Sequence, residues 1–315
     1  MRACGSKIGR LGVCFFLLAS LVLPASAGAA EVLRFGILPV VDTLPLLVAQ
    51  EKGFFTGQGI SLQTISFQSA LERDAALQAG NLDGYFGDIL NTVLLIHSGQ
   101  QLKIITTCFH TNPRFRMFGV VAAPSLKVRS LEELRGKQVA ISRATIIEYL
   151  LDKILQKNGL PADFVKKQEI KNIPIRLQML LADKVDAALL PEPLLTLAES
   201  KGARVVADDR DLDMALTVLA VRSSLIKRSP TVVQRFLIAY RQGVREINRN
   251  PEKFKDLLVR RTRFPQSIRD SYRIPEFPPV SLPLPGDVAA TQVWLQHKAM
   301  VKQLLPYEMI VGGSK

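Results

Sequence analysis

The 315-residue chain is poor in the side chains that carry most enzymatic chemistry, with three cysteines, three histidines and one tryptophan. Two of the cysteines, Cys4 and Cys14, lie near the N-terminus, and Cys108 lies in an apolar stretch typical of a buried strand. The histidines do not have the spacing of metal ligands. The motifs G-x-S-x-G and H-E-x-x-H and a glycine-rich phosphate loop are also absent. These absences predict a protein with no catalytic residue, no metal site and no cofactor.

Long apolar segments are scarce as well. The most apolar one, Leu11–Leu23, has about 13 residues, fewer than the roughly 20 that a membrane-spanning helix needs. It follows three basic residues and precedes small-x-small patterns that end at Ala27 and Ala29. We therefore predict a cleavable signal peptide over residues 1–29, with cleavage after Ala27 or Ala29. The mature chain is then a periplasmic protein in which Cys108 has no disulfide partner.

The chain has a formal charge of +13. In a cytoplasmic protein this charge would suggest nucleic-acid binding, but export removes that class of partner. The basic residues are scattered, apart from one dense stretch within 260–273. The pattern of this stretch favours a solvated face over a partner surface.

The sequence contains one structural unit twice. The segment GILPVVDTLPLLVAQEKGFF resembles VAISRATIIEYLLDKILQKNGL, because each has an apolar strand, a polar turn and an amphipathic helix. Downstream, Arg73 precedes Asp83 by the same ten positions that separate Arg176 from Asp186. The alternation predicts an α/β fold with two lobes, a mostly parallel sheet in each and a ligand cleft between them. One long sheet with two halves is the alternative.

The chain is expected to pass between the lobes at two extended segments, 114–126 and 214–225. We therefore assign residues 30–117 and 222–315 to lobe I and residues 118–221 to lobe II. The proline-rich segment IPEFPPVSLPLPGD predicts a surface strap, because a helical pattern follows it.

Ligands of parallel α/β sheets bind beyond the carboxyl ends of the strands, where helices begin. Ser142 and Arg143 have no helix to cap, so we expect both to contact the ligand, while Thr145 starts the helix that follows. Glu192 lies between two prolines and is expected to line the cleft. The full set of predicted ligand-binding residues is Asp42, Gln68, Ser69, Asp88, Ser142, Arg143, Thr145 and Glu192.

The chemistry of these turns constrains the ligand. Helix N-termini and Arg143 favour an anionic group. Three carboxylates among the candidates would repel a bare inorganic anion. We therefore expect a small organic molecule that has an anionic group and also a hydrogen-bond donor or a cationic group. Capping of free backbone N–H groups is the alternative role for Asp42, Ser69, Asp88 and Thr145.

Several segments resemble a known family. They are LPLLVAQEKGFFTGQGISL, ALQAGNLDG, SLEELRGKQVAIS, LLADKVDAALLPEP and GARVVAD, within residues 31–245. The chain is similar to the exported substrate-binding proteins of ABC importers, in the branch that serves nitrate, sulfonates, taurine and the thiamine pyrimidine precursor. The resemblance implies a periplasmic, monomeric protein that closes on a small-molecule solute and delivers it to an ABC permease in the inner membrane. An enzyme related to thiamine pyrimidine synthesis and a ligand-sensing module of a membrane sensor are the alternatives.

Overall fold

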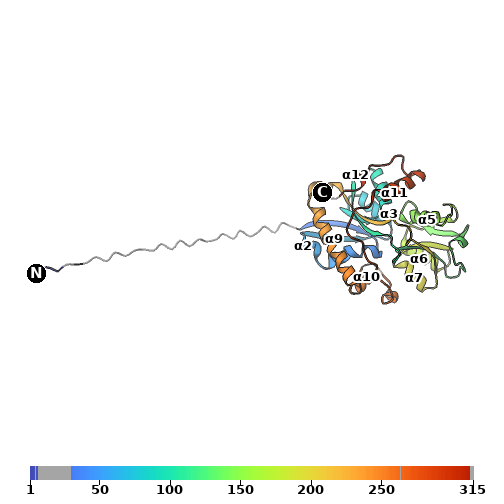
Figure 1. The fold of residues 1–315 in the computed structure, drawn as a ribbon, viewed down its shortest axis with the longest axis horizontal. Helices are drawn as coiled ribbons and strands as arrows, with labels where there is room; N and C mark the ends of the chain where they lie inside the picture. Colours follow the sequence, from blue (N-terminus) through green and yellow to red (C-terminus); the bar gives the residue numbers. More distant parts are fainter. Residues whose placement is uncertain (4, 6–29, 263, 313–315) are drawn as a thin grey trace.

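The structure is a computed structural model that describes residues 1–3, 5, 30–262 and 264–312. The predicted cleavage sites, and all of the predicted signal peptide except residues 1–3 and 5, lie outside the described residues. Two lobes lie side by side, the first mainly blue and orange and the second green and yellow (Figure 1). Each lobe contains one five-stranded sheet. This arrangement confirms the predicted two-lobed α/β fold and excludes one long sheet.

The strand order of the first sheet is β2 (Ile60–Ser66), β1 (Glu31–Ile37), β3 (Gly84–Gly87), β10 (Ala215–Arg222) and β4 (Leu102–His110). β1 is parallel to β2 and β3, whereas β10 is antiparallel to β3 and β4. The side chains of β10 are buried along nearly its whole length. A mostly apolar strand of this kind is expected where a sheet is covered on both faces.

The strand order of the second sheet is β7 (Lys166–Glu169), β6 (Gln138–Ile141), β8 (Ala187–Pro191), β5 (Phe118–Ala122) and β9 (Arg204–Asp208). β6 is parallel to β7 and β8, and β5 is antiparallel to β8 and β9. The antiparallel strand therefore has the same place in both sheets. The structural unit that occurs twice in the sequence therefore corresponds to two sheets with the same strand topology.

Helices connect the parallel strands in the same way in both lobes. The first unit has η1 (Val41–Thr43), α1 (Leu44–Glu51), α2 (Phe54–Gly57), α3 (Ala70–Gln78) and α4 (Ile89–His97). The second has η2 (Glu132–Leu134), α5 (Ile146–Lys157), α6 (Ile173–Leu181) and α7 (Leu194–Ser200). Helices begin directly after β1, β3, β6 and β8, at the carboxyl edges of the sheets.

The chain crosses between the lobes after β4 and again after β9. The two crossing segments are bonded to each other, because Thr111 and Met214 exchange two hydrogen bonds. The carboxylate of Asp209 also accepts a hydrogen bond from Met117 N–H at 3.0 Å. Burial raises the pKa of Asp209 to about 7, although N–H donors of the opposite segment lower it in part.

The pairing of β10 bears on the division into lobes. The sequence assigns residues up to 221 to lobe II, but β10 lies between β3 and β4 of the first sheet. A strand that returns from the second lobe completes the sheet to which it returns, as β5 does in the other direction. We therefore propose residues 118–214 as lobe II and leave the remaining described residues from 30 onward in lobe I.

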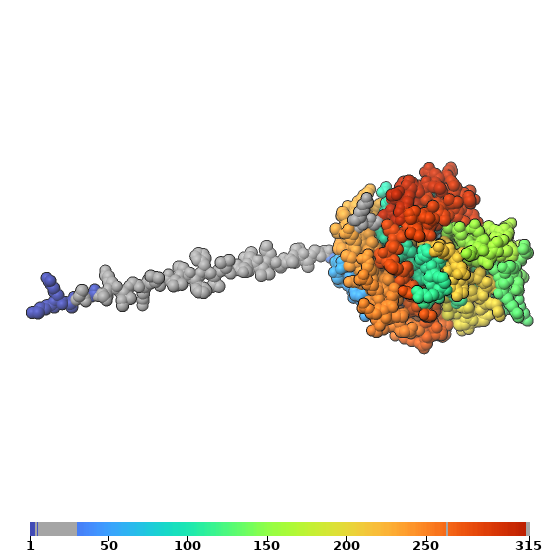
Figure 2. Space-filling model, in the orientation of Figure 1, coloured from blue at the N-terminus to red at the C-terminus, as the bar shows by residue number. Residues whose placement is uncertain are grey.

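The chain after β10 covers the first lobe. Its elements are α8 (Ser223–Arg228), α9 (Val232–Arg249), η3 (Pro251–Phe254), α10 (Lys255–Thr262), η4 (Gln266–Ile268), α11 (Pro285–His297) and α12 (Tyr307–Ile310). The proline-rich segment before α11 has no regular secondary structure, and its Ser281 carbonyl accepts from Thr107 N–H of β4 at 2.7 Å. In Figure 2 the red C-terminal residues lie against the green ones of the second lobe. Of the helices in the described part of the chain, none is long and apolar enough to cross a bilayer.

The described arginines of the basic stretch within 260–273 contact other residues of the protein at its surface. Arg260 pairs with Glu51, and Arg269 pairs with Asp256. The side chain of Arg273 lies over the ring of Phe115, 5.0 Å from its centroid. These contacts agree with a solvated face whose charges have local partners.

Gly243 of α9 lies where this helix touches α1. A Cβ atom at this position would be 2.3 Å from Pro45 O. Gly243→Ala should therefore lower the free energy of unfolding by about 2 kcal/mol, because α9 has to move away from α1. Chemical denaturation measures this change. Gly286→Ala in α11 is the matched control, since nothing lies within 4 Å of its added Cβ, and an equal loss in both variants would contradict the close helix contact.

Candidate ligand-binding cavity

A cavity lies beyond the carboxyl ends of the parallel strands and is lined by residues of both lobes. Its volume open to water is about 50 Å³, which is room for a few water molecules. Its wall is mostly apolar with a few buried polar groups, the composition typical of small-molecule sites. The polar lining residues are Asp42, Arg73, Asp88 and Thr217 from the first lobe and Ser142, Thr145, Lys171 and Arg176 from the second.

Four helices begin at this cavity. Their N-cap side chains are Ser69 for α3, Asp88 for α4, Thr145 for α5 and Asn172 for α6, and each accepts a hydrogen bond from a first-turn N–H. The N–H groups that the caps leave free, and the helix dipoles, direct partial positive charge towards the cavity. This environment favours an anionic group on the ligand.

Two S/T-x-x-E sequences, Ser69 to Glu72 and Thr145 to Glu148, form arrangements close to the capping box, in which the N-cap side chain and the glutamate each accept a backbone N–H. The glutamate of each box reaches back one residue further than expected. Glu72 accepts from Gln68 N–H at 3.1 Å, and Glu148 accepts from Ala144 N–H at 2.9 Å. These bonds fix the turn that precedes each helix, so the glutamates help to place the cavity wall.

Two buried arginines have equivalent places in the two lobes. Arg73 on α3 donates to Phe86 O of β3 at 2.8 Å, and Arg176 on α6 donates to Leu189 O of β8 at 3.2 Å. Each of these bonds spans 13 positions of sequence. Both guanidinium groups line the cavity and retain N–H groups without an acceptor among the described residues.

The two arginines differ in their counter-charge. Arg73 binds the carboxylate of Asp74 through Nε and Nη2. Arg176 donates to backbone carbonyl oxygens, and no carboxylate pairs with it in the described part of the chain. The residue that follows it is the apolar Leu177. Burial lowers the pKa of Arg176 to about 10, so the group stays charged at neutral pH and offers an anion a partner.

The first lobe contributes buried oxygens to the same wall. Asp42 Oδ2 and Thr217 Oγ1 have no hydrogen-bond partner among the described residues. Burial raises the pKa of Asp42 to about 6, and the nearby Thr217 hydroxyl lowers it in part. Burial also raises the pKa of Asp88 to about 6, against the effect of Asn91 N–H and the charge of Arg73. The unpartnered oxygens are acceptors for an N–H or O–H group of a ligand.

Aromatic side chains form part of the apolar wall. Phe86 of β3 and Phe118 of β5 line the cavity from opposite lobes. Tyr85 points away from it, because its hydroxyl bonds to Thr92 Oγ1 at 2.7 Å. Alternation along β3 therefore places one of the two neighbouring aromatic rings in the wall.

The structure brings Asp42, Asp88, Ser142 and Thr145 together in the lining. Asp88 and Thr145 therefore combine capping with a place in the wall. Ser69 caps α3 from just outside the lining. The backbone carbonyl of Gln68 accepts from Ile173 N–H of the second lobe at 3.3 Å, so Gln68 joins the lobes beside the cavity.

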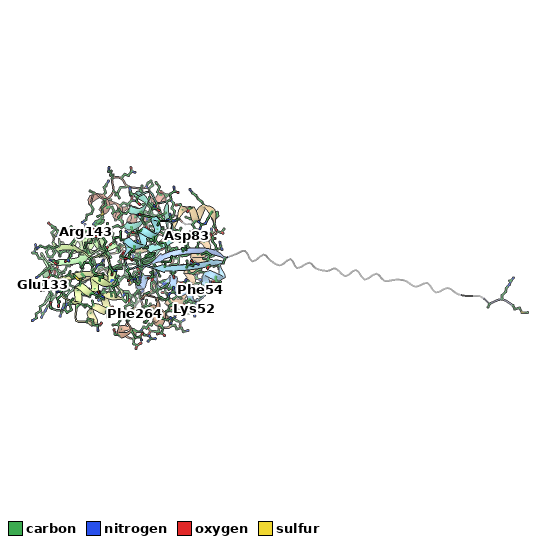
Figure 3. The ribbon with its side chains drawn as sticks, turned by 180° about the vertical axis from the view of Figure 1, so that it is seen from behind. Lys52, Phe54, Asp83, Glu133, Arg143 and Phe264 are labelled. Atoms are coloured by element: carbon green, nitrogen blue, oxygen red, sulfur yellow. The ribbon has the colours of Figure 1, made fainter. Side chains whose placement is uncertain are left out.

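The structure does not bring Arg143 and Glu192 into the lining. Side chains alternate at the end of β6, so Ser142 faces the cavity while the half-exposed Arg143 donates to Lys167 O at 3.1 Å. Figure 3 labels Arg143 in the second lobe. Glu192 is buried but accepts from Arg116 Nε at 3.2 Å and from the Thr196 hydroxyl at 2.9 Å. Both side chains therefore have partners within the protein.

Arg176 and Thr217 were absent from the set predicted from sequence. The signal for Arg176 is the one charged residue in the mostly apolar helix IPIRLQMLL, at the position that Arg73 has in the other copy. Thr217 is the one hydroxyl within the buried strand ALTVLAVR. In both cases a polar group interrupts an apolar element, which indicates a specific partner or a ligand. Among the described residues, no group of His, Cys, Asp and Glu side chains is arranged to hold a metal ion.

Two α/β lobes that are joined by two crossing segments and share a cavity define a bilobal binding-protein fold. The chain belongs to the family described as NMT1/THI5 like, which matches residues 41–254. This span contains all the polar residues of the cavity wall.

Curated relatives share a moderate part of the sequence. The riboflavin-binding protein RibY of Chloroflexus aurantiacus is 24% identical over 71% of this chain and 64% of its own length. A putative binding protein of Brucella abortus is 28% identical over 68% of this chain and 66% of its own length. The bicarbonate-binding protein CmpA of Synechococcus elongatus is 27% identical over 40% of this chain and 29% of its own length. The chain thus spans just under two thirds of the length of the first two relatives.

Solved structures of similar fold are more numerous. The periplasmic aliphatic sulphonate-binding protein SsuA of Escherichia coli has a TM-score of 0.74 at 17% identity and covers 90% of this chain and 93% of its own. The alkanesulfonate-binding protein SsuA of Xanthomonas axonopodis pv. citri, bound to MOPS, has a TM-score of 0.75 at 18% identity, with coverage of 90% and 99%. The desulfurization enzyme DSZB has a TM-score of 0.62 at 18% identity, with coverage of 89% and 96%. At these identities the likeness shows the fold.

Burial of Asp42 predicts that stability depends on pH. Its pKa is about 6 in the folded protein, against 3.8 for an ordinary aspartate. The folded state therefore holds this proton more tightly than the unfolded chain, and its contribution to stability is lost as the pH rises through about 6. Asp42→Asn removes the titration. Urea denaturation should show the variant gaining about 2 kcal/mol on the wild type from about pH 4 to pH 7, and parallel pH profiles would contradict the burial of an ionisable Asp42.

Proposed function

We propose that the chain is an exported solute-binding protein that captures a small organic molecule with an anionic group and delivers it to an ABC importer. The observation that carries the proposal is the buried, carboxylate-free guanidinium of Arg176 at a cavity where four helices begin. We further propose that the protein acts in the periplasm as a monomer.

Recognition divides between the lobes. The second lobe supplies positive charge through Arg176 and the N-termini of α5 and α6, which suits the anionic group. The first lobe supplies the unpartnered oxygens of Asp42 and Thr217, which suit a donor or cationic group. A solute that has both groups therefore bridges the lobes.

The size of the cavity bears on how the solute enters. With about 50 Å³ open to water, it holds a molecule of more than a few heavy atoms only if the lobes separate first. We propose that they separate around the crossing segments near 111–117 and 209–214, which alone connect the two sheets among the described residues. Closure then surrounds the solute and excludes water.

The comparisons support a binding role and leave the solute open. RibY and CmpA are named for riboflavin and bicarbonate, and the SsuA proteins for sulfonates. A fold shared by proteins with such different ligands supports a small solute without selecting one. DSZB shows that an enzyme can have this fold, so an enzyme on the same scaffold is the alternative that a turnover measurement decides.

The solute is found by mass spectrometry of small molecules released from the purified protein by mild denaturation. A thermal-shift screen of sulfonates, amino acids and pyrimidines is the complement, since a ligand at 100 times its dissociation constant adds about 2.7 kcal/mol of stability. We expect one class to bind, one molecule per protein, and to be recovered unchanged. Chemical conversion of the bound compound by the purified protein would overturn the proposal.

Arg176 and Arg143 offer a matched pair of substitutions. Arg176→Lys keeps the charge but loses the planar fork that binds an anion with two hydrogen bonds, so affinity for the solute from the screen should fall by about tenfold or more. Arg143→Lys makes the same change outside the cavity lining and should leave the affinity within about twofold. Calorimetric titration measures both, and equal affinities for the two variants would remove Arg176 from the site.

A further inference from the structure

Helix α11, near the C-terminal end of the described chain, is attached to the first lobe. It packs on α4, and the side chain of Gln292 exchanges two hydrogen bonds with the backbone of Leu305. The chain that follows returns to the first sheet, where Gly312 N–H donates to Ile104 O of β4 at 3.0 Å. These contacts make α11 part of lobe I.

The end of α11 contacts α5, which belongs to the second lobe (Figures 1 and 2). Lys298 Nζ lies 2.9 Å from Asp152 Oδ2 and 3.5 Å from Glu148 Oε1. Trp294 Nε1 donates to Asp152 Oδ2 at 3.1 Å. The Trp294 ring meets that of Tyr149 edge-on, with 5.3 Å between their centroids. One face of α5 is thus held by charge, a hydrogen bond and aromatic packing from the other lobe.

The negative charges of Glu148 and Asp152 are balanced only when α11 brings Lys298 to them. Glu148 and Asp152 lie one turn apart on α5, with side chains 3% and 8% exposed. Lys167 of β7 pairs with Asp152 and lies 3.9 Å from Glu148. The half-exposed Arg143 also lies 3.9 Å from Glu148, but water screens this pair. Without Lys298, two nearly buried carboxylates share one buried ammonium group, which is unfavourable.

Glu148 connects this contact to the ligand cavity. Its Oε1 faces Lys298, while its Oε2 accepts from Ala144 N–H in the turn before α5. In the same turn, Thr145 Oγ1 donates to Ser142 O at 2.7 Å. Ser142 and Thr145 both line the cavity. The carboxylate of Glu148 therefore links the position of α11 to the conformation of the cavity wall.

We propose that Trp294 and Lys298 are positioning residues for the cavity. They hold α5, and with it the turn at 142–145, against the first lobe, and their loss allows the lobes to separate. Neither residue lines the cavity. The inference goes beyond the identity of the solute, because it concerns the arrangement of the lobes in the unliganded protein.

The test measures the separation of the lobes directly. Leu71 on α3 and Ile175 on α6 are 58% and 47% exposed, and each lies in the first turn of a helix that begins at the cavity. Leu71→Cys and Ile175→Cys accept spin labels in the full chain with Cys4→Ser and Cys14→Ser, since Cys108 is buried. Pulsed electron paramagnetic resonance without solute then reports the distance between the two lobes.

Lys298→Met keeps the stem of the side chain and removes its charge. We expect it to add a longer distance, with the ratio of long to short distances rising by about tenfold, which corresponds to about 1.4 kcal/mol. Trp294→Phe keeps the aromatic packing, removes the hydrogen bond to Asp152 and should act in the same direction. Lys298→Arg should restore the short distance, because a cation returns to the two carboxylates.

Lys302→Met is the matched control, because Lys302 is exposed on the same segment and forms no ion pair with α5. Its distance distribution should equal that of the parent protein. Identical distributions in Lys298→Met and the parent would overturn the proposal. So would a fall in the unfolding temperature without a longer distance, since that result assigns the contact a structural role alone. Because no solute is present, neither outcome depends on the solute screen.

Discussion

The burial of two guanidinium groups constrains how both lobes are built. A charged group in an apolar interior is tolerated only when hydrogen bonds and counter-charge compensate for the lost water. Arg73 and Arg176 are both almost fully buried, and each ties its helix to a carbonyl oxygen of the next strand. These bonds set the distance between helix and strand at the edge of the sheet where the cavity lies. Asp74 supplies the counter-charge of Arg73, whereas no carboxylate among the described residues pairs with Arg176. This difference is the basis for our proposal that an anionic ligand pairs with Arg176.

The repeat and its divergence together explain an asymmetric site in a symmetric scaffold. Both lobes have the same strand order and the same arginine bond over 13 positions. The residue after the arginine is Asp74 in one copy and Leu177 in the other. The positive charge of Arg73 is therefore compensated within the first lobe, while that of Arg176 is not compensated within the second. Separately, Asp42 and Thr217 of the first lobe give the cavity its unpartnered oxygens. A solute with an acceptor at one end and a donor at the other matches this polarity.

The sequence predicted what depends on local pattern. The two α/β units and the helix starts at Ser69, Asp88 and Thr145 follow from periodicity, capping residues and spacing, all of which act over a few turns. The segments 114–126 and 214–225, predicted as the crossings, contain β5 and β10, and the chain crosses between the lobes just before each of these strands. The partners of Glu192 and the sheet of β10 depend on contacts far apart in the sequence. Arg116, which binds Glu192, is 76 positions away, and no local pattern indicates such a pair. The direction of Arg143 depends on alternation at a strand end, where one position decides which side chain faces the cavity.

The turn at 142–145 contributes both to the cavity wall and, through Glu148, to the contact between the lobes. Ala144 has a φ of 55°, a left-handed conformation that costs a residue with a Cβ about 1 kcal/mol or more. Glu148 offsets that cost by accepting the Ala144 N–H, and Thr145 adds a bond back to Ser142 O. The carboxylate that stabilises the turn also faces Lys298 of the other lobe. The Glu148 side chain therefore takes part both in the conformation of the cavity wall and in the contact between the lobes. A change in one of these should alter the other.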